Sequence, residues 1–497
     1  MVWLLFGAVN GTWPMWGGEP AHHSLQIMKG AMADTPVVKW KFATGDIVEW
    51  QAAAIADVDG DGLIEVVLGS VDRNVYCLRG TNGTQKWAFT TTTELWATPA
   101  VANVDADAEL EIIAINYYGR IYCLRGTNGA QQWMVQIGGV QSSPAVANVD
   151  GGTDLEIVVG DFNHVLWCRS ATNGASKWSY TTGDSIWSSP AVGDCDGDGN
   201  MDVVVGSMDN KVYCVNGQNG ALKWSFTTGY WVWSSPAIAN IDGGTDMEVI
   251  VGSNDGKVYC LRGSNGTQKW ATNISGNVQS PAIADVDGDG QLDVVVGTQG
   301  SVVCLNGSNG TVKWATPAGW AHNPVHLADV DGDNKLEVLV PSNLDSVLRC
   351  YNAENGSLLW TKKLALDIHA PFTGDIDNDG CIEIVLGTNE DMSIYALDDL
   401  NNTSGCGSLG SEVSEGERGA IPGPDFRIMG ASIYLFVPNA TWIFLSLYDA
   451  TGRPVQNLYE GVLPAGGHSF IPVVKRGGIY LAVLSYQGGM KTLRVIR

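Results

Sequence analysis

The sequence predicts an all-β protein: a closed eight-bladed β-propeller followed by a small immunoglobulin-like β-sandwich. Three observations predict it. A tryptophan recurs eight times at intervals of 44–47 residues, each interval holds four short runs of β-branched and aromatic residues, and the first and last units are complementary. A four-stranded antiparallel unit of about 45 residues is the sequence mark of a propeller blade.

The recurring tryptophan ends each unit, mostly after a lysine. The eight positions are Trp40, Trp87, Trp133, Trp178, Trp224, Trp270, Trp314 and Trp360. In the unit that ends near Trp224, the runs lie around Ala191 and at Val203–Val205, Lys211–Val215 and Lys223–Phe226, with Gly, Asn and Asp between them. Such runs and turns are strand and hairpin signals. We expect the eight tryptophans to pack one blade against the next.

The two ends of the repeat predict how the ring closes. The last unit stops after its third run, at Ser393–Leu397, and an unmatched fourth run, Val37–Thr44, stands at the N-terminus. Pairing of these two runs completes the eighth blade and leaves no free sheet edge.

The expected organisation has four parts. Residues 1–35 form an N-terminal segment whose apolar run Val2–Val9 is interpreted as the remnant of a secretory signal peptide. Residues 36–398 form the propeller. Residues 399–428 are rich in Gly, Ser, Asn, Glu and Pro, which is typical of a flexible linker. Residues 429–497 return to short strands and form the sandwich.

Composition excludes several classes of partner. The 497 residues carry a formal charge of −25, which argues against binding to nucleic acid or to an anionic membrane surface. No apolar run approaches the roughly 20 residues of a membrane-spanning helix. More than half of the 53 acidic residues lie in eight short loops. The acidity therefore points to bound cations.

Each of these loops has nine residues and lies between the first and second strands of a blade. Complete copies carry carboxylates at positions 1, 3, 5 and 9, and position 6 tolerates a positive φ. A backbone carbonyl at position 7 completes a shell of hard oxygen ligands, which suits Ca²⁺ far better than Zn²⁺ or copper. The opening matches an EF-hand loop, but the closing carboxylate comes at position 9 rather than 12 and strands flank it. The predicted ligands of the five complete loops are Asp57, Asp59, Asp61, Glu65, Asp194, Asp196, Asp198, Asp202, Asp285, Asp287, Asp289, Asp293, Asp329, Asp331, Asp333, Glu337, Asp375, Asp377, Asp379 and Glu383.

Three loops, in blades 2, 3 and 5, depart from the pattern. The first has Ala108 in place of the turn glycine, and the other two have Gly152 and Gly244 in place of the position-5 carboxylate. Their predicted ligands are Asn103, Asp105, Asp107, Glu111, Asn148, Asp150, Asp154, Glu156, Asn240, Asp242, Asp246 and Glu248. Plain turns are the alternative, but carboxylates packed this closely repel one another without a counter-ion. We expect five to eight structural Ca²⁺ ions.

Seven of the ten cysteines occupy one repeat position in the third strand: Cys77, Cys123, Cys168, Cys214, Cys260, Cys304 and Cys350. Equivalent positions in neighbouring blades are expected to lie about 10 Å apart, beyond the reach of a disulfide. We therefore expect small buried apolar side chains. Cys195, Cys381 and Cys406 are expected to be unpaired.

A second aromatic set precedes the first strands. Three residues before the proline that opens these strands, or its equivalent, stand Trp50, Trp96, Gln141, Trp187 and Trp233, and the last two blades carry Trp320, His322 and His369 nearby. First strands line the channel of a propeller, so these side chains should gather at the mouth opposite the acidic loops. They form either an aromatic platform for a sugar or another flat ligand, or the hydrophobic filling of a wide channel. No zinc spacing and no Ser or Cys nucleophile pattern accompanies the histidines, so no catalytic residue is predicted.

The repeats resemble known families. The Asn-Gly…Lys-Trp blade ends resemble quinoprotein-type (PQQ-like) repeats, as in quinoprotein dehydrogenases and the outer-membrane assembly scaffold lipoprotein. The Asp-x-Asp-Gly-Asp-Gly…Val-Val-Val-Gly segments resemble the calcium-binding FG-GAP and VCBS repeats of integrin α-chains and bacterial surface proteins. An adjacent Cys-Cys pair and a Cys-x-x-Cys-His haem motif, common in quinoprotein alcohol dehydrogenases, do not occur here. The resemblance therefore implies the fold rather than the dehydrogenase activity.

The tail resembles a third family. Leu447–Val455, Leu463–His468, Gly478–Tyr480 and Lys491–Ile496 are similar to the C-terminal sorting domain of the Por (type IX) secretion system. That resemblance implies export across an outer membrane, followed by release or surface attachment. A general immunoglobulin-like accessory domain is the alternative.

Together these features favour a secreted or cell-surface, calcium-stabilised propeller that binds a glycan or protein ligand and is not an enzyme. The alternatives are an enzyme on the same fold, either a quinoprotein dehydrogenase or a polysaccharide-cleaving propeller, and a purely architectural component of a surface layer or filament.

Overall fold

The computed structural model describes residue 22, residues 24–48, residues 53–399 apart from 106, 108, 153, 245, 320–323 and 366, and Cys406; of residues 425–496 it describes the backbone of the strands. The chain divides into two compact units, Met1–Ser411 and Glu412–Arg497. The regular elements of the described parts are strands. No helix there has the length and apolar character needed to cross a membrane.

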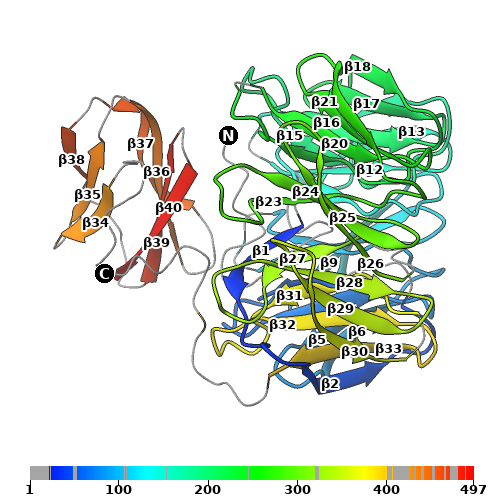
Figure 1. Ribbon diagram of the computed structural model, residues 1–497. Helices are drawn as coiled ribbons and strands as arrows, with labels where there is room; N and C mark the ends of the chain where they lie inside the picture. Colours follow the sequence, from blue (N-terminus) through cyan, green and yellow to red (C-terminus); the bar gives the residue numbers. More distant parts are fainter. Residues whose placement is uncertain are drawn as a thin grey trace. The chain divides into compact units, whose positions relative to one another are not determined.

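Six blades of the first unit each hold four consecutive antiparallel strands (Figure 1). Blade 1 is β3–β6 (Ala54–Ala56, Glu65–Gly69, Asn74–Arg79, Gln85–Thr90), blade 2 is β7–β10 (Ala100–Ala102, Glu111–Ile115, Arg120–Arg125, Gln131–Gln136) and blade 3 is β11–β14 (Ala145–Ala147, Glu156–Gly160, Val165–Ser170, Ser176–Thr181). Blade 4 is β15–β18 (Ala191–Gly193, Asp202–Ser207, Lys211–Asn216, Leu222–Thr227), blade 5 is β19–β22 (Ala237–Ala239, Glu248–Gly252, Lys257–Arg262, Gln268–Asn273) and blade 6 is β23–β26 (Ala282–Ala284, Asp293–Gly297, Ser301–Asn306, Val312–Pro317).

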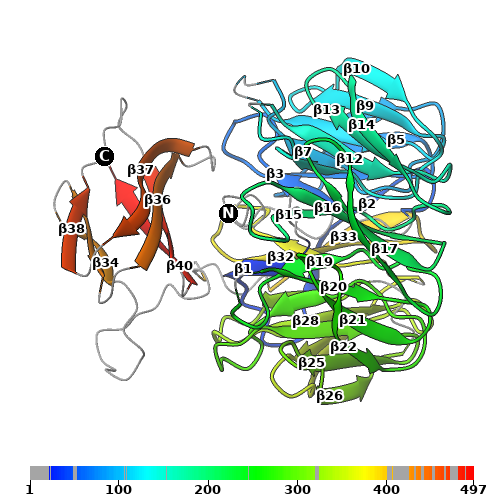
Figure 2. The same ribbon diagram turned by 90° about the horizontal axis from the view of Figure 1, so that it is seen from above.

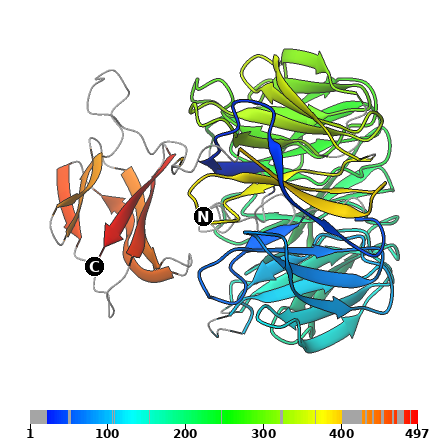
Figure 3. The ribbon, with the colours of Figure 1, turned by 90° about the horizontal axis from the view of Figure 1, so that it is seen from below.

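The last two blades use the N-terminal part of the chain. Blade 7 is β27–β30 (His326–Asp329, Glu337–Ser342, Val347–Asn352, Leu358–Lys363), and β1 (Leu25–Lys29) adds a fifth strand to it. Blade 8 is β31–β33 (Phe372–Gly374, Glu383–Thr388, Ser393–Asp398), and β2 (Val37–Ala43) is its fourth strand. Strand β2 pairs antiparallel with β33, and Trp40 lies opposite Ala396 in this register. Figure 3 shows the blue N-terminal part of the chain beside the yellow strands of the last blade. The predicted eight-bladed ring and its closure are confirmed.

Neighbouring blades are joined by the recurring tryptophans. The indole N–H of Trp87 donates to the Gly126 carbonyl of the next blade at 2.7 Å, and that of Trp224 donates to the Gly263 carbonyl at 2.6 Å. The second strands are buried on both faces because each lies between two blades; β16, for example, is buried along its whole length. The core is consequently a series of hydrophobic clusters between blades rather than one central core.

The short first strands lie at the centre of the ring, because each contacts the first strand of the next blade from β3 to β27. In Figure 2, which views the ring from the side, the fourth strands β10 and β26 lie at opposite margins. Serines that precede the first strands link successive blades. Ser143 Oγ accepts a hydrogen bond from the Thr98 N–H at 3.0 Å, Ser189 Oγ accepts one from the Ser143 N–H at 3.0 Å, and Ser235 Oγ accepts one from the Ser189 N–H at 2.9 Å. This chain of hydroxyls holds the inner strands of blades 2 to 5 in register.

An N-terminal strand lies inside the ring. Strand β1 runs parallel to β27 and lies against β23 and β31, the first strands of the two adjacent blades. Just before β1, His22 Nδ1 lies 3.1 Å from the Pro236 carbonyl of blade 5. Within β1, the Gln26 amide donates to the Thr373 carbonyl of blade 8 at 3.0 Å. Both side chains are buried. The segment expected to precede the propeller therefore contributes an axial strand to it.

The second unit contains two antiparallel sheets. One is β34 (Asp425–Met429), β35 (Ser432–Val437) and β38 (Gly466–Phe470); the other, in the order β37-β36-β39-β40, is β36 (Thr441–Asp449), β37 (Pro454–Leu463), β39 (Ile479–Tyr486) and β40 (Gly489–Ile496). Two sheets of this kind match the predicted sandwich. Strand β34 begins within the stretch predicted as linker, and β37 is a strand that the sequence pattern did not indicate.

Candidate functional site

The blade topology separates the two predicted sites. Each first strand begins shortly after the second aromatic set and ends at an acidic loop, as β15 does between Trp187 and Asp194. The antiparallel second strand then returns to the starting face. The acidic loops and the aromatic positions therefore lie on opposite faces of the ring.

Backbone N–H groups of the acidic loops donate hydrogen bonds to carboxylates of the same loop. In blade 1, Asp57 accepts hydrogen bonds from the Gly60 N–H at 2.8 Å and the Gly62 N–H at 2.9 Å, and Glu65 Oε2 accepts one from the Val58 N–H at 3.2 Å. Gly62 has φ of 87°, which meets the expectation of a left-handed residue at position 6. Other carboxylate oxygens of the loop, Oδ1 of Asp59 among them, take no part in these bonds.

Those oxygens suit a hard cation. Carboxylate oxygens of Asp57, Asp59 and Asp61 lie within 4.8 Å of one another, as do those of Asp285, Asp287 and Asp289. The position-3 oxygens Oδ1 of Asp59, Asp196 and Asp287 are buried and have no hydrogen-bond partner among the described residues. Clustered carboxylate oxygens, some of them without a hydrogen-bond partner, form the donor set that Ca²⁺ prefers. The residues present fit such an ion.

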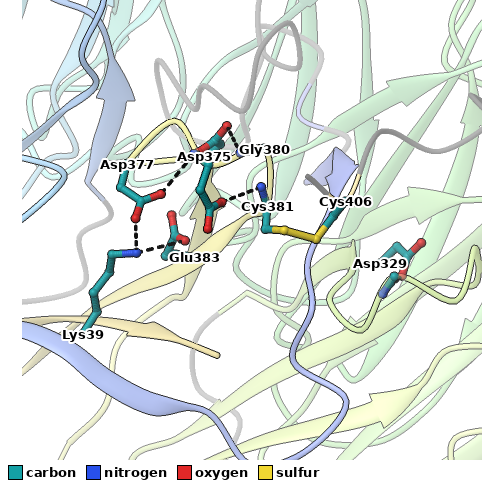
Figure 4. The surroundings of a disulfide bond; sticks show 10 residues. Lys39, Asp329, Asp375, Asp377, Gly380, Cys381, Glu383 and Cys406 are labelled. Carbon is teal, nitrogen blue, oxygen red and sulfur yellow. Dashed lines mark hydrogen bonds and ion pairs between the residues drawn. A yellow bond between two sulfur atoms is a disulfide. The ribbon is translucent and has the colours of Figure 1, made fainter. Parts of the chain in front are cut away.

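A lysine already bridges two of the carboxylates in six of the eight loops. It is the residue before the recurring tryptophan, and its Nζ contacts the carboxylates at positions 3 and 9. The six are Lys39, Lys86, Lys177, Lys223, Lys269 and Lys313, each at 2.5–3.4 Å from the position-9 oxygen. In the last blade, Lys39 reaches Asp377 and Glu383 from the N-terminal strand (Figure 4). The sequence pattern alone did not indicate this role of the lysine.

Blades 2 and 7 lack that lysine and carry Gln132 and Leu359 at its position. Burial raises the pKa of Glu111 in blade 2 to about 7, and nearby carboxylates add to the effect. Burial likewise raises the pKa of Glu337 in blade 7 to about 9, with Asp331 next in importance. Neither group has a basic side chain within ion-pair distance among the described residues. The position-9 carboxylates of these two loops therefore lack the ammonium contact that Glu65 makes in blade 1.

One prediction about the cysteines is wrong. Cys381 and Cys406 form a disulfide, with their Cα atoms 4.9 Å apart (Figure 4). The Cys406 N–H also donates to the Gly380 carbonyl at 3.0 Å. Sequence spacing did not indicate this pair because 25 residues separate them and the chain between them completes the eighth blade before it returns to the acidic loop. The disulfide ties the segment after the last strand to position 7 of that loop.

The other cysteines match their prediction. The seven at the third-strand position are buried and free, and Cys195 is also buried and free. Burial raises the pKa of the thiols at this position, as at Cys77 and Cys304, so they stay protonated and behave as small apolar groups.

On the opposite face, aromatic rings form a continuous row across blades 2 to 5. Trp187 and Trp233 stack with centroids 5.4 Å apart and planes 9° apart, and Trp231 extends the stack at 5.9 Å and 15°. The rings of this aromatic row, in spatial order, are Trp96, Tyr117, Phe162, Trp187, Trp233, Trp231 and Tyr230, with Tyr118 beside Tyr117. Most members are half-buried, whereas Tyr118 and Tyr230 are 63% and 45% exposed.

The predicted ligand-binding residues divide into three groups. Trp96, Trp187 and Trp233 lie in the aromatic row, and Gln141 is half-buried in the blade between them. His369 is 1% exposed, and its Nε2 lies 2.8 Å from Asn389 Oδ1, so it is part of the interior of blade 8. Trp50, Trp320 and His322 fall outside the described residues.

The aromatic row also contains residues that the sequence pattern did not single out. Tyr117 and Phe162 occupy the same repeat position, two residues after the end of the second strand, and Met208 is their equivalent in blade 4. The Trp233 indole N–H contacts the Met208 sulfur. An alignment of the repeats at this position shows two aromatic residues in succession, which is the signal that would have found them.

Eight blades built from these repeats define the chain as a propeller of the quinoprotein type. The chain belongs to the family described as outer membrane protein assembly factor BamB, which matches residues 33–180 and 154–334. Among curated proteins, none matches the chain in sequence.

Three similar solved structures share the fold. They are BamB from Moraxella catarrhalis (12% identity, 73% of this chain and 100% of that chain covered, TM-score 0.55), the quinohemoprotein alcohol dehydrogenase ADHIIG from Pseudomonas putida HK5 (13%, 84% and 83%, 0.61) and a europium-containing methanol dehydrogenase (11%, 78% and 98%, 0.61). These neighbours include enzymes and an assembly factor, so the fold alone does not select between catalysis and binding.

Proposed function

We propose that this chain is an extracytoplasmic, calcium-stabilised propeller that binds a glycan on the face of the aromatic row and does not catalyse a reaction. The aromatic row carries the proposal. Its rings touch one another across four blades, and two of its tyrosines are exposed. Contiguous aromatic surface on a rigid scaffold is typical of a binding site, because ring faces and edges contact the apolar faces of a ligand while polar groups at the rim orient it.

A location outside the cytoplasm is supported by three features. The Cys381–Cys406 disulfide is of a kind that persists in oxidising compartments. The family to which the chain belongs is described as outer membrane protein assembly factor BamB. The tail resembles a sorting domain for export, as its residues at Leu447–Val455 suggest.

Calcium is supported by the chemistry of the acidic loops. Their ligands are carboxylate oxygens, and a fully charged loop without a cation places like charges within 4.8 Å. An ion bound in these loops braces the turn between first and second strands, far from the aromatic row. Its role in the proposal is structural.

The axial strand supports a binding role over catalysis in the channel. His22 and Gln26 are buried between the inner strands of blades 5 and 8, so a cofactor placed on the axis competes with the chain's own side chains. His326, on the first strand of blade 7, is also buried and lies 2.7 Å from the Thr373 hydroxyl. The dehydrogenases among the similar structures favour the enzyme alternative, which the experiment below includes.

The test is a thermal-shift and affinity screen of the calcium-loaded full chain against polysaccharides, oligosaccharides, proteins of the bacterial surface and pyrroloquinoline quinone. We expect a glycan to raise the melting temperature. Tyr118→Ala and Tyr230→Ala should weaken that glycan about tenfold or more without loss of fold, since both side chains are exposed. Leu344→Ala, which removes a 69% exposed side chain outside the row, is the matched control.

Other outcomes contradict the proposal. Binding that survives both tyrosine substitutions together with Trp233→Ala places the site elsewhere. Stabilisation by the quinone alone, with dye reduction in the presence of an alcohol, establishes the dehydrogenase. A response to surface proteins but to no glycan favours a protein-binding or architectural role.

A further inference from the structure

The interface between blades 2 and 3 differs from the other seven interfaces at two side chains. One is the recurring tryptophan of blade 2, Trp133, which packs against blade 3. The other is Arg169, which follows the third-strand cysteine of blade 3. In the other seven blades this position holds a buried aliphatic or aromatic residue: Leu78, Leu124, Val215, Leu261, Leu305, Tyr351 and Leu397.

Trp133 lacks the hydrogen bond that the other recurring tryptophans make. Each of those seven donates its indole N–H to a backbone carbonyl across the interface, at 2.6–3.1 Å. The Nε1 of Trp133 is buried and has no acceptor among the described residues. A buried indole N–H usually finds a partner, because an unpaired donor has lost its water without replacement.

Arg169 supplies a second unpaired donor at this interface. Its Nε is buried and has no acceptor among the described residues, while Nη1 donates to the Gly174 carbonyl at 3.0 Å. Its Cζ lies 4.8 Å from the centre of the Trp167 ring. Burial lowers the pKa of the guanidinium, and no neighbouring carboxylate opposes this effect. An arginine remains charged in a protein, so this charge has no counter-ion in the described part of the chain.

Two observations place these donors at one location. In each of the seven other interfaces, the tryptophan and the residue equivalent to Arg169 belong to the same hydrophobic cluster. Gly174, which accepts the Arg169 hydrogen bond, also lies against Trp133, since an added Cβ would be 3.1 Å from Cε3 of that ring. Arg169 is half-buried, so part of its side chain is open to solvent.

We propose that Arg169 and Trp133 bind a small oxyanion at the interface of blades 2 and 3. The guanidinium supplies the positive charge and a planar set of N–H donors that matches sulfate, phosphate and carboxylate groups. The indole N–H supplies one more donor. An ordered water would satisfy either donor, but it would leave the guanidinium charge without a counter-ion.

The test is a titration of the full chain with inorganic sulfate, and in parallel with formate, at constant calcium concentration. Thermal shift and calorimetry are the measurements, and sodium chloride at equal ionic strength is the reference. We expect a saturable rise in melting temperature with sulfate or formate that chloride does not produce. Sulfate also stabilises folded proteins without binding a site, so its effect on the wild type is compared with its effect on variants.

Three variants locate the response. Arg169→Leu installs the residue that five other blades carry at this position, so it should fold, and it should weaken the oxyanion about tenfold or more. Trp133→Phe removes the N–H but keeps a ring, and should weaken the oxyanion about fivefold, the worth of one neutral hydrogen bond. Arg125→Leu removes an exposed arginine at the end of the neighbouring third strand and should keep the wild-type affinity.

Three outcomes overturn the proposal. Equal oxyanion affinity in the wild type and in Arg169→Leu places anion binding elsewhere. A wild type without a saturable response to sulfate or formate shows that water satisfies both donors. Weakened binding in Arg169→Leu together with wild-type affinity in Trp133→Phe overturns the two-residue site. The proposed calcium and glycan binding stand or fall independently of these results, because neither uses Arg169 or Trp133.

Discussion

The ammonium nitrogen of Lys86 lies 2.9 Å from Oε1 of Glu65, a side chain that is 1% exposed and 21 residues away in sequence. Burial lowers the pKa of Lys86, but its hydrogen bonds to Asp59 and Glu65 outweigh this and raise the pKa above its ordinary value. Burial also raises the pKa of Glu65 to about 7, which the ion pair with Lys86 opposes. The lysine therefore acts as a built-in counter-ion for the acidic loop of its own blade.

Replacing this lysine should lower the free energy of unfolding, because the loop carboxylates lose their positive partner. We expect Lys86→Met in metal-free buffer to lose about 3–5 kcal/mol of the free energy of unfolding, because a buried ion pair loses one partner. Added Ca²⁺ should restore part of this loss. The control is Lys41→Met, which breaks the more exposed pair with Asp391 and should cost about 1 kcal/mol or less. Urea unfolding measures both, and equal effects would show that the loop carboxylates do not depend on Lys86.

The disulfide should stabilise the closure of the ring. Reduction of Cys381–Cys406, or its replacement by two serines, should cost about 2–4 kcal/mol, since the cross-link restricts the unfolded chain. Thermal melts with and without a reductant measure this. The double serine variant should not respond to reductant; a wild-type melt that is also unaffected would argue against the bond.

The tryptophan contact between blades should require a glycine opposite the ring. Gly266 has φ of 69°, and an added Cβ would lie 2.5 Å from Cε3 of Trp224. Gly243 has φ of 72°, but nothing lies within 4 Å of an added Cβ. Gly243→Ala should therefore cost only the left-handed backbone penalty of about 1–2 kcal/mol, and Gly266→Ala about 1–3 kcal/mol more. Chemical denaturation of the two variants provides the comparison, and equal losses would contradict the packing role.

The buried histidine of blade 7 should make the protein sensitive to acid. Burial lowers the pKa of His326 from 6.5 to about 3. Since the folded state resists protonation, the stability contributed by neutral His326 is fully present above pH 6.5 and is lost as the pH falls towards 3. At pH 5 the loss is about 2 kcal/mol. His326→Gln should remove this component, so the wild type should lose about 2 kcal/mol more of its free energy of unfolding than the variant between pH 7.5 and pH 5. Parallel curves of stability against pH would refute the prediction.

Much of the candidate site could be predicted from local spacing. The positions of Asp57, Asp59, Asp61 and Glu65 follow from one short loop, and the aromatic positions Trp187 and Trp233 follow from the repeat. Contacts that join distant strands could not be predicted this way. Tyr117 and Phe162 enter the aromatic row because the second strand of each blade ends on the face where the next first strand begins.

The sequence by itself determined the blade period, the number of blades and the pairing of the first run with the last, because a 44–47-residue repeat with a missing fourth strand has one way to bury its edges. Only the tertiary structure decided which acidic loops have a lysine as counter-ion, that Cys381 forms a disulfide with Cys406, and that Leu25–Lys29 pairs with the first strand of blade 7 inside the ring. These are contacts of side chains and segments that ring closure brings together, and no local periodicity specifies them. Lys86 reaches Glu65 because two hairpins fold the fourth strand back beside the loop that follows the first.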